Sequence, residues 1–165
     1  MSYQKILVGI DGSKQSEMAF SKAVDIAKQN DAALYLLSVI KGERYPTTSP
    51  SGFGFVDKSI YDSAIQEMNK RLAENKQKAE DAGVKEVHTD VEIGNAKVEL
   101  AEKYPKDNGI DLIVIGATGL NAIGRLIVGS TAAYTVRIAP CDVTVVKTDL
   151  NNQKLDIKES SYPEI

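Results

Sequence analysis

Residues 111–116 read DLIVIG, a short run of mostly branched apolar residues between an acid and a glycine. Similar runs occur at 5–10 (KILVGI), 33–40 (ALYLLSVI) and 142–147 (DVTVVK). Nearly continuous apolar runs of this length are typical of strands covered on both faces, as in a parallel sheet. The alternating run at 86–93 (EVHTDVEI) predicts a fifth strand with one solvated face, at an edge of the sheet.

Helical patterns fill the gaps between these runs, and they predict helices over residues 13–29, 59–82, 95–104 and 130–139. Asp11 or Ser13 can cap the first helix, and Gly83 suits the left-handed position after the second. Pro105 and Pro140 are expected to stop the other two. This alternation predicts a single-domain α/β fold, an open five-stranded parallel sheet with helices on both faces. Ligands of such sheets bind beyond the carboxyl ends of the strands, where the strand order reverses.

Composition limits the partners. The chain has 165 residues, of which 42% are hydrophobic and 26% charged, as expected of one globular domain. Its net charge of −3 argues against nucleic acid or an anionic membrane as the main partner. No apolar run approaches the roughly 20 residues of a membrane span. We therefore expect a cytoplasmic protein.

Composition also limits the chemistry, because the chain has one histidine and one cysteine. His88 lies in the alternating run and is expected on its solvated side. Cys141 follows a proline at the start of a buried strand and is expected to pack as a small apolar residue. Neither residue is predicted to be catalytic.

One combination of residues indicates phosphate binding. Gly116-Ala117-Thr118-Gly119 is followed, nine residues later, by Gly129-Ser130-Thr131 at the expected start of the last helix. Glycines let backbone N–H groups approach a ligand closely, and a helix N-terminus presents unpaired N–H donors. Arg125, between the two groups, would add a positive charge. Each residue alone is consistent with a turn or a cap, but the combination at the end of a buried strand favours a phosphate site.

Other nucleotide-binding motifs are absent from the sequence. There is no G-x4-G-K-(S/T) of P-loop NTPases, and no G-x-G-x-x-G follows the first strand. Phospho-receiver domains would need an acidic pair after that strand, where only Asp11 is present. ATP pyrophosphatases carry Ser-Gly-Gly there, in place of the sequence at 9–13, GIDGS.

The chain resembles the universal stress proteins, in the branch that binds ATP. That branch carries G-x2-G-x9-G-(S/T), which Gly116, Gly119, Gly129 and Ser130 match. ILVGIDGS, DLIVIGATG and IAPCDVTVV also look like the family. The resemblance covers roughly residues 3–147, so residues 1–147 are expected to form the nucleotide-binding domain and 148–165 a C-terminal tail.

The resemblance implies a nucleoside end of the site. Gly9 and Ile10 would line the base pocket, and Asp11 would lie beside the ribose or adenine, where it could help to place a metal. Val39 would offer its backbone to the adenine edge, and residues 115–116 would pack under the ribose. For Asp11 the alternative is a helix cap, and for Val39 a core strand residue.

The resemblance also implies a phosphate end. Thr118 and Gly119 would meet the phosphates, and Gly129, Ser130 and Thr131 would close the cradle. Many relatives carry a basic or histidine side chain in place of Thr118. The full set expected to bind ATP, together with Mg²⁺ or another divalent cation, is Gly9, Ile10, Asp11, Val39, Ile115, Gly116, Thr118, Gly119, Arg125, Gly129, Ser130 and Thr131.

Three functions remain open at this point. The first is a stress-response module in which ATP occupancy changes the shape or partners of a dimer. The second is a slow ATPase or self-phosphorylating enzyme, for which no general base is evident. The third is a protein-contact domain that binds no nucleotide. The first is favoured because the glycine motif is intact.

Three segments at the edges of this pattern carry further expectations. By resemblance, the strand at 142–147 pairs with its twin in a homodimer, and an apolar edge strand invites such pairing unless the tail covers it. The segment 41–57, rich in Gly, Pro, Ser and Thr, follows the second strand at the ligand edge. It is expected to be a lid over the ligand or a variable surface loop.

Overall fold

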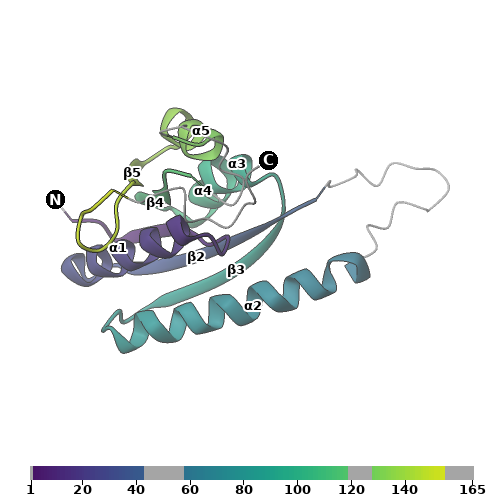
Figure 1. The fold of residues 1–165 in the computed structure, drawn as a ribbon, viewed down its shortest axis with the longest axis horizontal. Helices are drawn as coiled ribbons and strands as arrows, with labels where there is room; N and C mark the ends of the chain where they lie inside the picture. The colour runs from purple at the N-terminus through teal and green to yellow at the C-terminus, as the bar shows by residue number, and fades with distance from the viewer. Residues whose placement is uncertain (1, 43–57, 119–127, 155–165) are drawn as a thin grey trace.

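The five expected strands form one parallel sheet in the order β3-β2-β1-β4-β5 (Figure 1). The computed structural model of the chain describes residues 2–42, 58–118 and 128–154. The strands are β1 (Lys5–Gly9), β2 (Ala33–Lys41), β3 (Val87–Gly94), β4 (Leu112–Gly116) and β5 (Asp142–Val146). The order reverses between β1 and β4, so the crevice that ligands use in such folds opens beyond these two strands.

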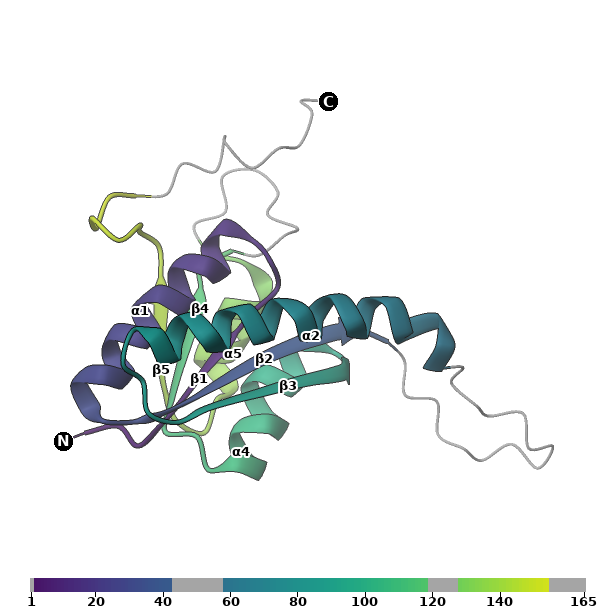
Figure 2. The ribbon, with the colours of Figure 1, turned by 90° about the horizontal axis from the view of Figure 1, so that it is seen from below.

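Helices cover both faces of the sheet, as the sequence predicted. They are α1 (Lys14–Asn30), α2 (Lys58–Asp81), α3 (Ala96–Val98), a π-helical turn η1 (Glu99–Lys103), α4 (Tyr104–Asn108) and α5 (Ser130–Ile138). Figures 1 and 2 show α1 and α2 on one side of the sheet and α4 and α5 on the other. Two apolar clusters result, one under α1 and α2 and one under η1, α4 and α5. Alternate residues of β1 divide between them: Ile6 and Val8 enter the first cluster, and Leu7 enters the second.

The start of α1 is fixed by Ser13, whose hydroxyl accepts a 3.1 Å hydrogen bond from the amide of Ser16. This is the N-cap that the sequence predicted. Ala19, Ala23 and Ala27 lie on one stripe of α1 and are at most 1% exposed. Their small side chains let the helix pack closely on β1 and β4.

The inward stripe of α2 is apolar only in part. Leu72 and Ala79 are buried, as their spacing predicted, and Gly83 has the left-handed φ of +106° expected after a helix. Asn75 shares this stripe and is only 2% exposed. The apolar pattern gave no reason to expect a buried amide there.

The expectation that Pro105 stops a helix at 104 is wrong, because helical structure continues through α4 to Asn108. The preceding turn is π-helical, and the amide of Tyr104 bonds five residues back to the carbonyl of Glu99. A proline lacks an N–H and crowds the carbonyl four residues before it, and the widened turn relieves both problems. Gly109, at φ +64°, ends the helix instead.

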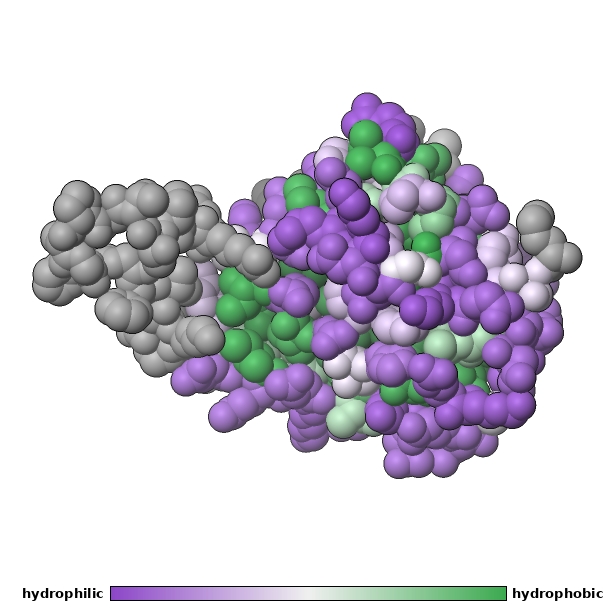
Figure 3. Space-filling model, turned by 180° about the vertical axis from the view of Figure 1, so that it is seen from behind, coloured by the Kyte–Doolittle hydropathy of each residue, from purple (hydrophilic) through white to green (hydrophobic). Residues whose placement is uncertain are grey.

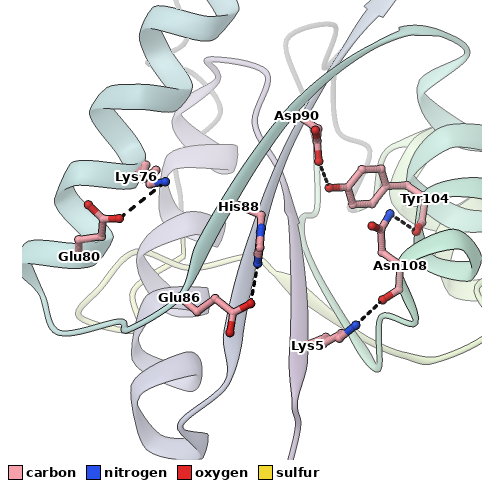
Figure 4. A network of polar contacts seen from close by, with 8 residues as sticks. All are labelled: Lys5, Lys76, Glu80, Glu86, His88, Asp90, Tyr104 and Asn108. Atoms are coloured by element: carbon pink, nitrogen blue, oxygen red, sulfur yellow. Dashed lines mark hydrogen bonds and ion pairs between the residues drawn. The ribbon is translucent and has the colours of Figure 1, made fainter.

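Strand β3 is an edge strand, as its alternating sequence predicted. His88 lies on the surface of β3, stacked on the ring of Tyr35 at 4.5 Å, with its Nε2 2.7 Å from a carboxylate oxygen of Glu86 (Figure 4). Its side chain is 44% exposed, which confirms the solvated position. None of the helices in the described part of the chain is both long and apolar enough to cross a membrane.

Candidate functional site

The two halves of the glycine motif meet beyond the end of β4. The amide of Gly129 donates a 2.6 Å hydrogen bond to the carbonyl of Ala117, and the amide of Ala117 donates to Val146 of β5 at 2.9 Å. A Cβ atom built on Gly129 would lie 3.2 Å from that same carbonyl oxygen, which is closer than most side chains tolerate. Glycine therefore permits the approach. Gly119 and Arg125 lie outside the described residues.

The N-terminus of α5 opens directly from this contact. Its N-cap is Gly129, which has no side chain to accept from the helix, and the first intrahelical bond runs from Ala133 to the carbonyl of Gly129. Within the described chain, the amides of residues 130–132 therefore have no helical or capping partner. Ser130 is exposed and Thr131 is half-buried. Unpaired amides with the positive end of the helix dipole form a site that suits an anion.

The turn between β1 and α1 lies at the same edge of the sheet. The Oδ1 atom of Asp11 accepts a 2.9 Å hydrogen bond from the amide of Ser13, so Asp11 stabilises the turn that leads into the helix cap. Gly12 has a φ of +81°, a conformation that favours glycine. The first turn of α1 packs on the end of β4, because a Cβ on Gly116 would lie 3.0 Å from the backbone of Gln15. The N-cap of α1 is Ser13, so the capping alternative for Asp11 is wrong. Asp11 supports the turn that leads into the cap, and its role beside a nucleoside stays a prediction.

The end of β2 extends past β1. The last contacts between them join the amide of Ile10 to the carbonyl of Leu37 at 2.8 Å and the hydroxyl of Ser38 to the carbonyl of Ile10 at 2.7 Å. Peptide groups along a strand turn to opposite sides at alternate residues, so those of Val39 point to the same side as those of Leu37. Among the described residues, no strand pairs with Val39 on that side. An N–H and a C=O are therefore available there for the edge of a base.

The remaining predicted residues divide between the two faces of the sheet. Ile115 is 7% exposed and belongs to the cluster under η1 and α5, and a Cβ on Gly9 would meet Leu100 of that cluster at 3.0 Å. Ile10 is 3% exposed and belongs to the opposite cluster. Thr118 is buried beside Gly129.

Another hollow, of about 430 Å³, lies between β3 and the helical segment η1–α4. Among the described residues that line it, carboxylates dominate, with Asp90, Glu92, Glu99 and Asp107 against the ammonium of Lys103. Four carboxylates beside one cation repel a phosphate, so this hollow is not a nucleotide site. The sequence reading missed it because it joins the solvated side of β3 to an unpredicted π-helical turn.

Polar contacts stiffen that side of the molecule. The hydroxyl of Tyr104 donates to the carboxylate of Asp90, and Lys5 reaches the carbonyl of Asn108 at 3.0 Å (Figure 4). Burial of the Tyr104 ring, followed by its hydrogen bond to Asp90, raises the pKa of the phenol far above its ordinary value. Tyr104 therefore stays protonated and acts as a structural donor.

The family of the chain follows from comparison with known proteins. The model of the universal stress protein family matches residues 2–147. The chain belongs to this family. A protein of Staphylococcus epidermidis whose name also places it among the universal stress proteins is 42% identical over 154 residues, covering 90% of this chain and 87% of the relative. A similarly named protein of Staphylococcus haemolyticus is 38% identical over 170 residues, covering all of this chain and 93% of the relative.

Solved universal stress proteins share the fold. UspA of Lactobacillus plantarum superposes with a TM-score of 0.77 at 33% identity, covering 88% of this chain and 99% of that one. A universal stress protein in complex with cAMP gives 0.68 at 24% identity, over 88% of this chain and 98% of that one. One from Archaeoglobus fulgidus in complex with dAMP gives 0.64 at 18% identity, over 89% and 100%. At these lower identities the likeness concerns the fold alone.

Proposed function

We propose that this universal stress protein binds ATP beyond the carboxyl ends of β1 and β4, and that nucleotide occupancy regulates its interactions in the cytoplasm. The single observation that carries the proposal is the N-terminus of α5. Its first amides have no capping side chain in the described chain, and the Gly129–Ala117 hydrogen bond holds them beside the end of β4. A triphosphate supplies the acceptors that these amides lack.

The nucleoside would lie across the neighbouring strand ends. Val39 would present its unpaired peptide groups to the adenine edge, and Asp11 would lie near the ribose. Two structural neighbours are in complex with cAMP and dAMP, so adenine nucleotides are ligands of this fold. We extend that chemistry to this chain because its glycine motif is intact.

Mg²⁺ would be held mainly by the nucleotide. No group of three acidic, histidine or cysteine side chains that could hold a metal exists within the described residues. A triphosphate that brings its own Mg²⁺ fits this setting, because Mg²⁺ commonly binds phosphates and one or two carboxylates. The ion would neutralise part of the phosphate charge beside the neutral Thr118.

Regulation is favoured over catalysis. Hydrolysis of ATP needs a group that orients water at the γ-phosphate, and the Oδ1 atom of Asp11 is engaged in the turn before α1. We therefore assign no catalytic residue. A slow ATPase or self-phosphorylating enzyme remains the second candidate, and it predicts turnover above background that falls when Ser130 is replaced.

We propose a homodimer as the form that responds to the nucleotide. Strand β5 is an edge of the sheet, and Val136 and Ile138 of the neighbouring helix α5 are 55% and 43% exposed. Figure 3 shows apolar surface at the top of the molecule, where α5 lies in Figure 1. Such exposed apolar side chains beside an unpaired edge favour a second copy of the chain as the partner.

Residues 1–147 would form the whole nucleotide-binding domain.

Calorimetric titration of nucleotide-free protein tests the binding proposal. ATP with Mg²⁺ is expected to bind tightly, GTP with Mg²⁺ much more weakly, and AMP, cAMP and dAMP serve to rank the contribution of the phosphates. Light scattering with and without ATP measures the oligomeric mass. Absence of heat for every adenine nucleotide would favour the third function, a protein-contact domain.

A further inference from the structure

Helix α2 carries two buried N–H donors that have no acceptor in the described chain. They are the Nε atom of Arg71 and the Nδ2 atom of Asn75. Asn75 is 2% exposed, and the two residues lie four positions apart, so they share one face of α2. Leaving a buried donor without an acceptor costs about 1–3 kcal/mol, so such a donor calls for an explanation.

Arg71 reaches the ligand edge of the sheet. A Cβ atom built on Gly12 would lie 2.9 Å from both Cζ and Nη1 of Arg71, so the guanidinium group lies against the Cα atom of Gly12. Gly12 directly follows Asp11 in the turn after β1. Gly12 has a φ of +81° and no side chain. The guanidinium group can therefore lie directly against the backbone of the turn.

Within the described residues, the charge of Arg71 is only weakly neutralised. Its Nη2 atom is 3.6 Å from an oxygen of Glu67 on the same helix, and the Glu67 side chain is 68% exposed. Exposed ion pairs of this kind contribute little. The Arg71 side chain is 33% exposed and its Nε atom is buried, so a ligand can reach only part of the side chain. Its five donors and lack of any acceptor define what it can bind, namely an acceptor atom.

The strand order indicates which part of a bound nucleotide Arg71 would contact. From β2 through β1 to β4, the edge presents Val39, then the Asp11–Gly12 turn, then Thr118 and Gly129. Helix α2 packs on β2 and β3, so Arg71 approaches from the nucleoside end, away from the N-terminus of α5. The geometry points to Arg71 as a further binding residue, which donates hydrogen bonds to acceptor atoms of the bound nucleoside. This inference rests on the proposed function.

Replacement of Arg71 by glutamine tests the contact, with ATP, adenosine and inorganic tripolyphosphate as ligands. Arg71→Gln is expected to weaken ATP and adenosine by the same factor, roughly tenfold or more, because a hydrogen bond to a charged donor is lost. Tripolyphosphate affinity is expected to stay unchanged. Lys76→Gln removes the same charge from a partly exposed position of α2, where Lys76 pairs with Glu80 at 3.8 Å, and is expected to leave all three affinities unchanged.

Arg71→Lys keeps the charge without the planar donor group, and it is expected to recover part of the lost adenosine affinity. Melting of each variant without ligand checks its fold, and a misfolded Arg71→Gln leaves Arg71→Lys to make the comparison. Unchanged adenosine affinity in both variants would overturn the inference. An equal loss of tripolyphosphate affinity in Arg71→Gln would also overturn it. So would a loss of adenosine affinity that disappears when Asp11 is replaced as well. A wild-type chain that binds none of the three ligands would contradict the proposed function itself.

Discussion

The amide of Gly129 donates a 2.6 Å hydrogen bond to the carbonyl of Ala117, and this contact joins the start of α5 to the end of β4. It places the first turn of α5 at the edge of the sheet where the strand order reverses. A helix N-terminus acts on an anion only over its first turn, so the position of this turn decides where a phosphate binds.

Gly129→Val should abolish ATP binding with a modest loss of stability. A Cβ at this position lies 3.2 Å from the carbonyl oxygen of Ala117, so the branched side chain would push the start of α5 away from β4. Ala133→Val adds the same side chain one turn further along α5, at an exposed position, and should bind ATP normally. Calorimetric titration of both variants measures the effect. Retained affinity in Gly129→Val would place the phosphates elsewhere.

Asp11 can be tested for its two roles separately. Asp11→Asn keeps an oxygen that can accept from the amide of Ser13, so its stability should match the wild type, whereas Asp11→Ala should lose about 1 kcal/mol because the hydrogen bond in the turn is lost. If the carboxylate contacts the nucleoside, both variants should lose ATP affinity and keep the affinity for inorganic tripolyphosphate. Urea unfolding and titration measure the two quantities. An unchanged preference for ATP over tripolyphosphate in both variants would leave Asp11 with its role in the turn before α1 only.

Tyr104→Phe should lower the free energy of unfolding by about 1–3 kcal/mol, because it removes a buried donor to the carboxylate of Asp90. Asp90→Asn keeps an acceptor for the phenol and should cost less. Both variants lie away from the proposed site, so ATP affinity should be unchanged. A stability equal to that of the wild type in Tyr104→Phe would mean that water replaces the contact at no cost.

Burial, together with the charges of Asp111 and Asp142, raises the pKa of Cys141 to about 11. The thiolate is the reactive form, so alkylation of the folded protein at pH 8 should be roughly a hundredfold slower than that of a free cysteine. The rate should rise about tenfold per pH unit until the pH nears that pKa. Mass spectrometry after timed iodoacetamide treatment, with urea-unfolded protein as the fast reference, follows the reaction. Equal rates in folded and unfolded protein would contradict the burial of the thiol.

The sequence predicted the sheet because its strands carry their own signal. Runs such as that at 111–116 are apolar on both faces, which is typical of parallel strands covered on both sides. The structure confirms all five strands and the cap at Ser13. The prediction that a helix ends before Pro105 was wrong. The helix continues through a π-helical turn, and the hydrogen bonds of such a turn cannot be predicted from the residue pattern.

The candidate site was predictable only where the glycine motif marks it. The structure brings Gly116, Thr118 and Gly129 together, while Gly119 and Arg125 lie outside the described residues. Arg71 was missed because it comes from a helix whose pattern shows only an amphipathic stripe. Its place beside Gly12 arises from the packing of α2 on β2 and β3, and such a contact between distant segments has no local signature.

Thermal melting of nucleotide-free protein, with and without excess ATP and Mg²⁺, tests the central claim most directly. A ligand at 100 times its Kd adds about 2.7 kcal/mol, which for a domain of this size raises Tm by roughly 5–10 °C. We predict this shift with ATP and none with GTP, because Val39 would read the adenine edge. No shift with ATP would contradict the nucleotide site and leave the glycine motif as a structural turn.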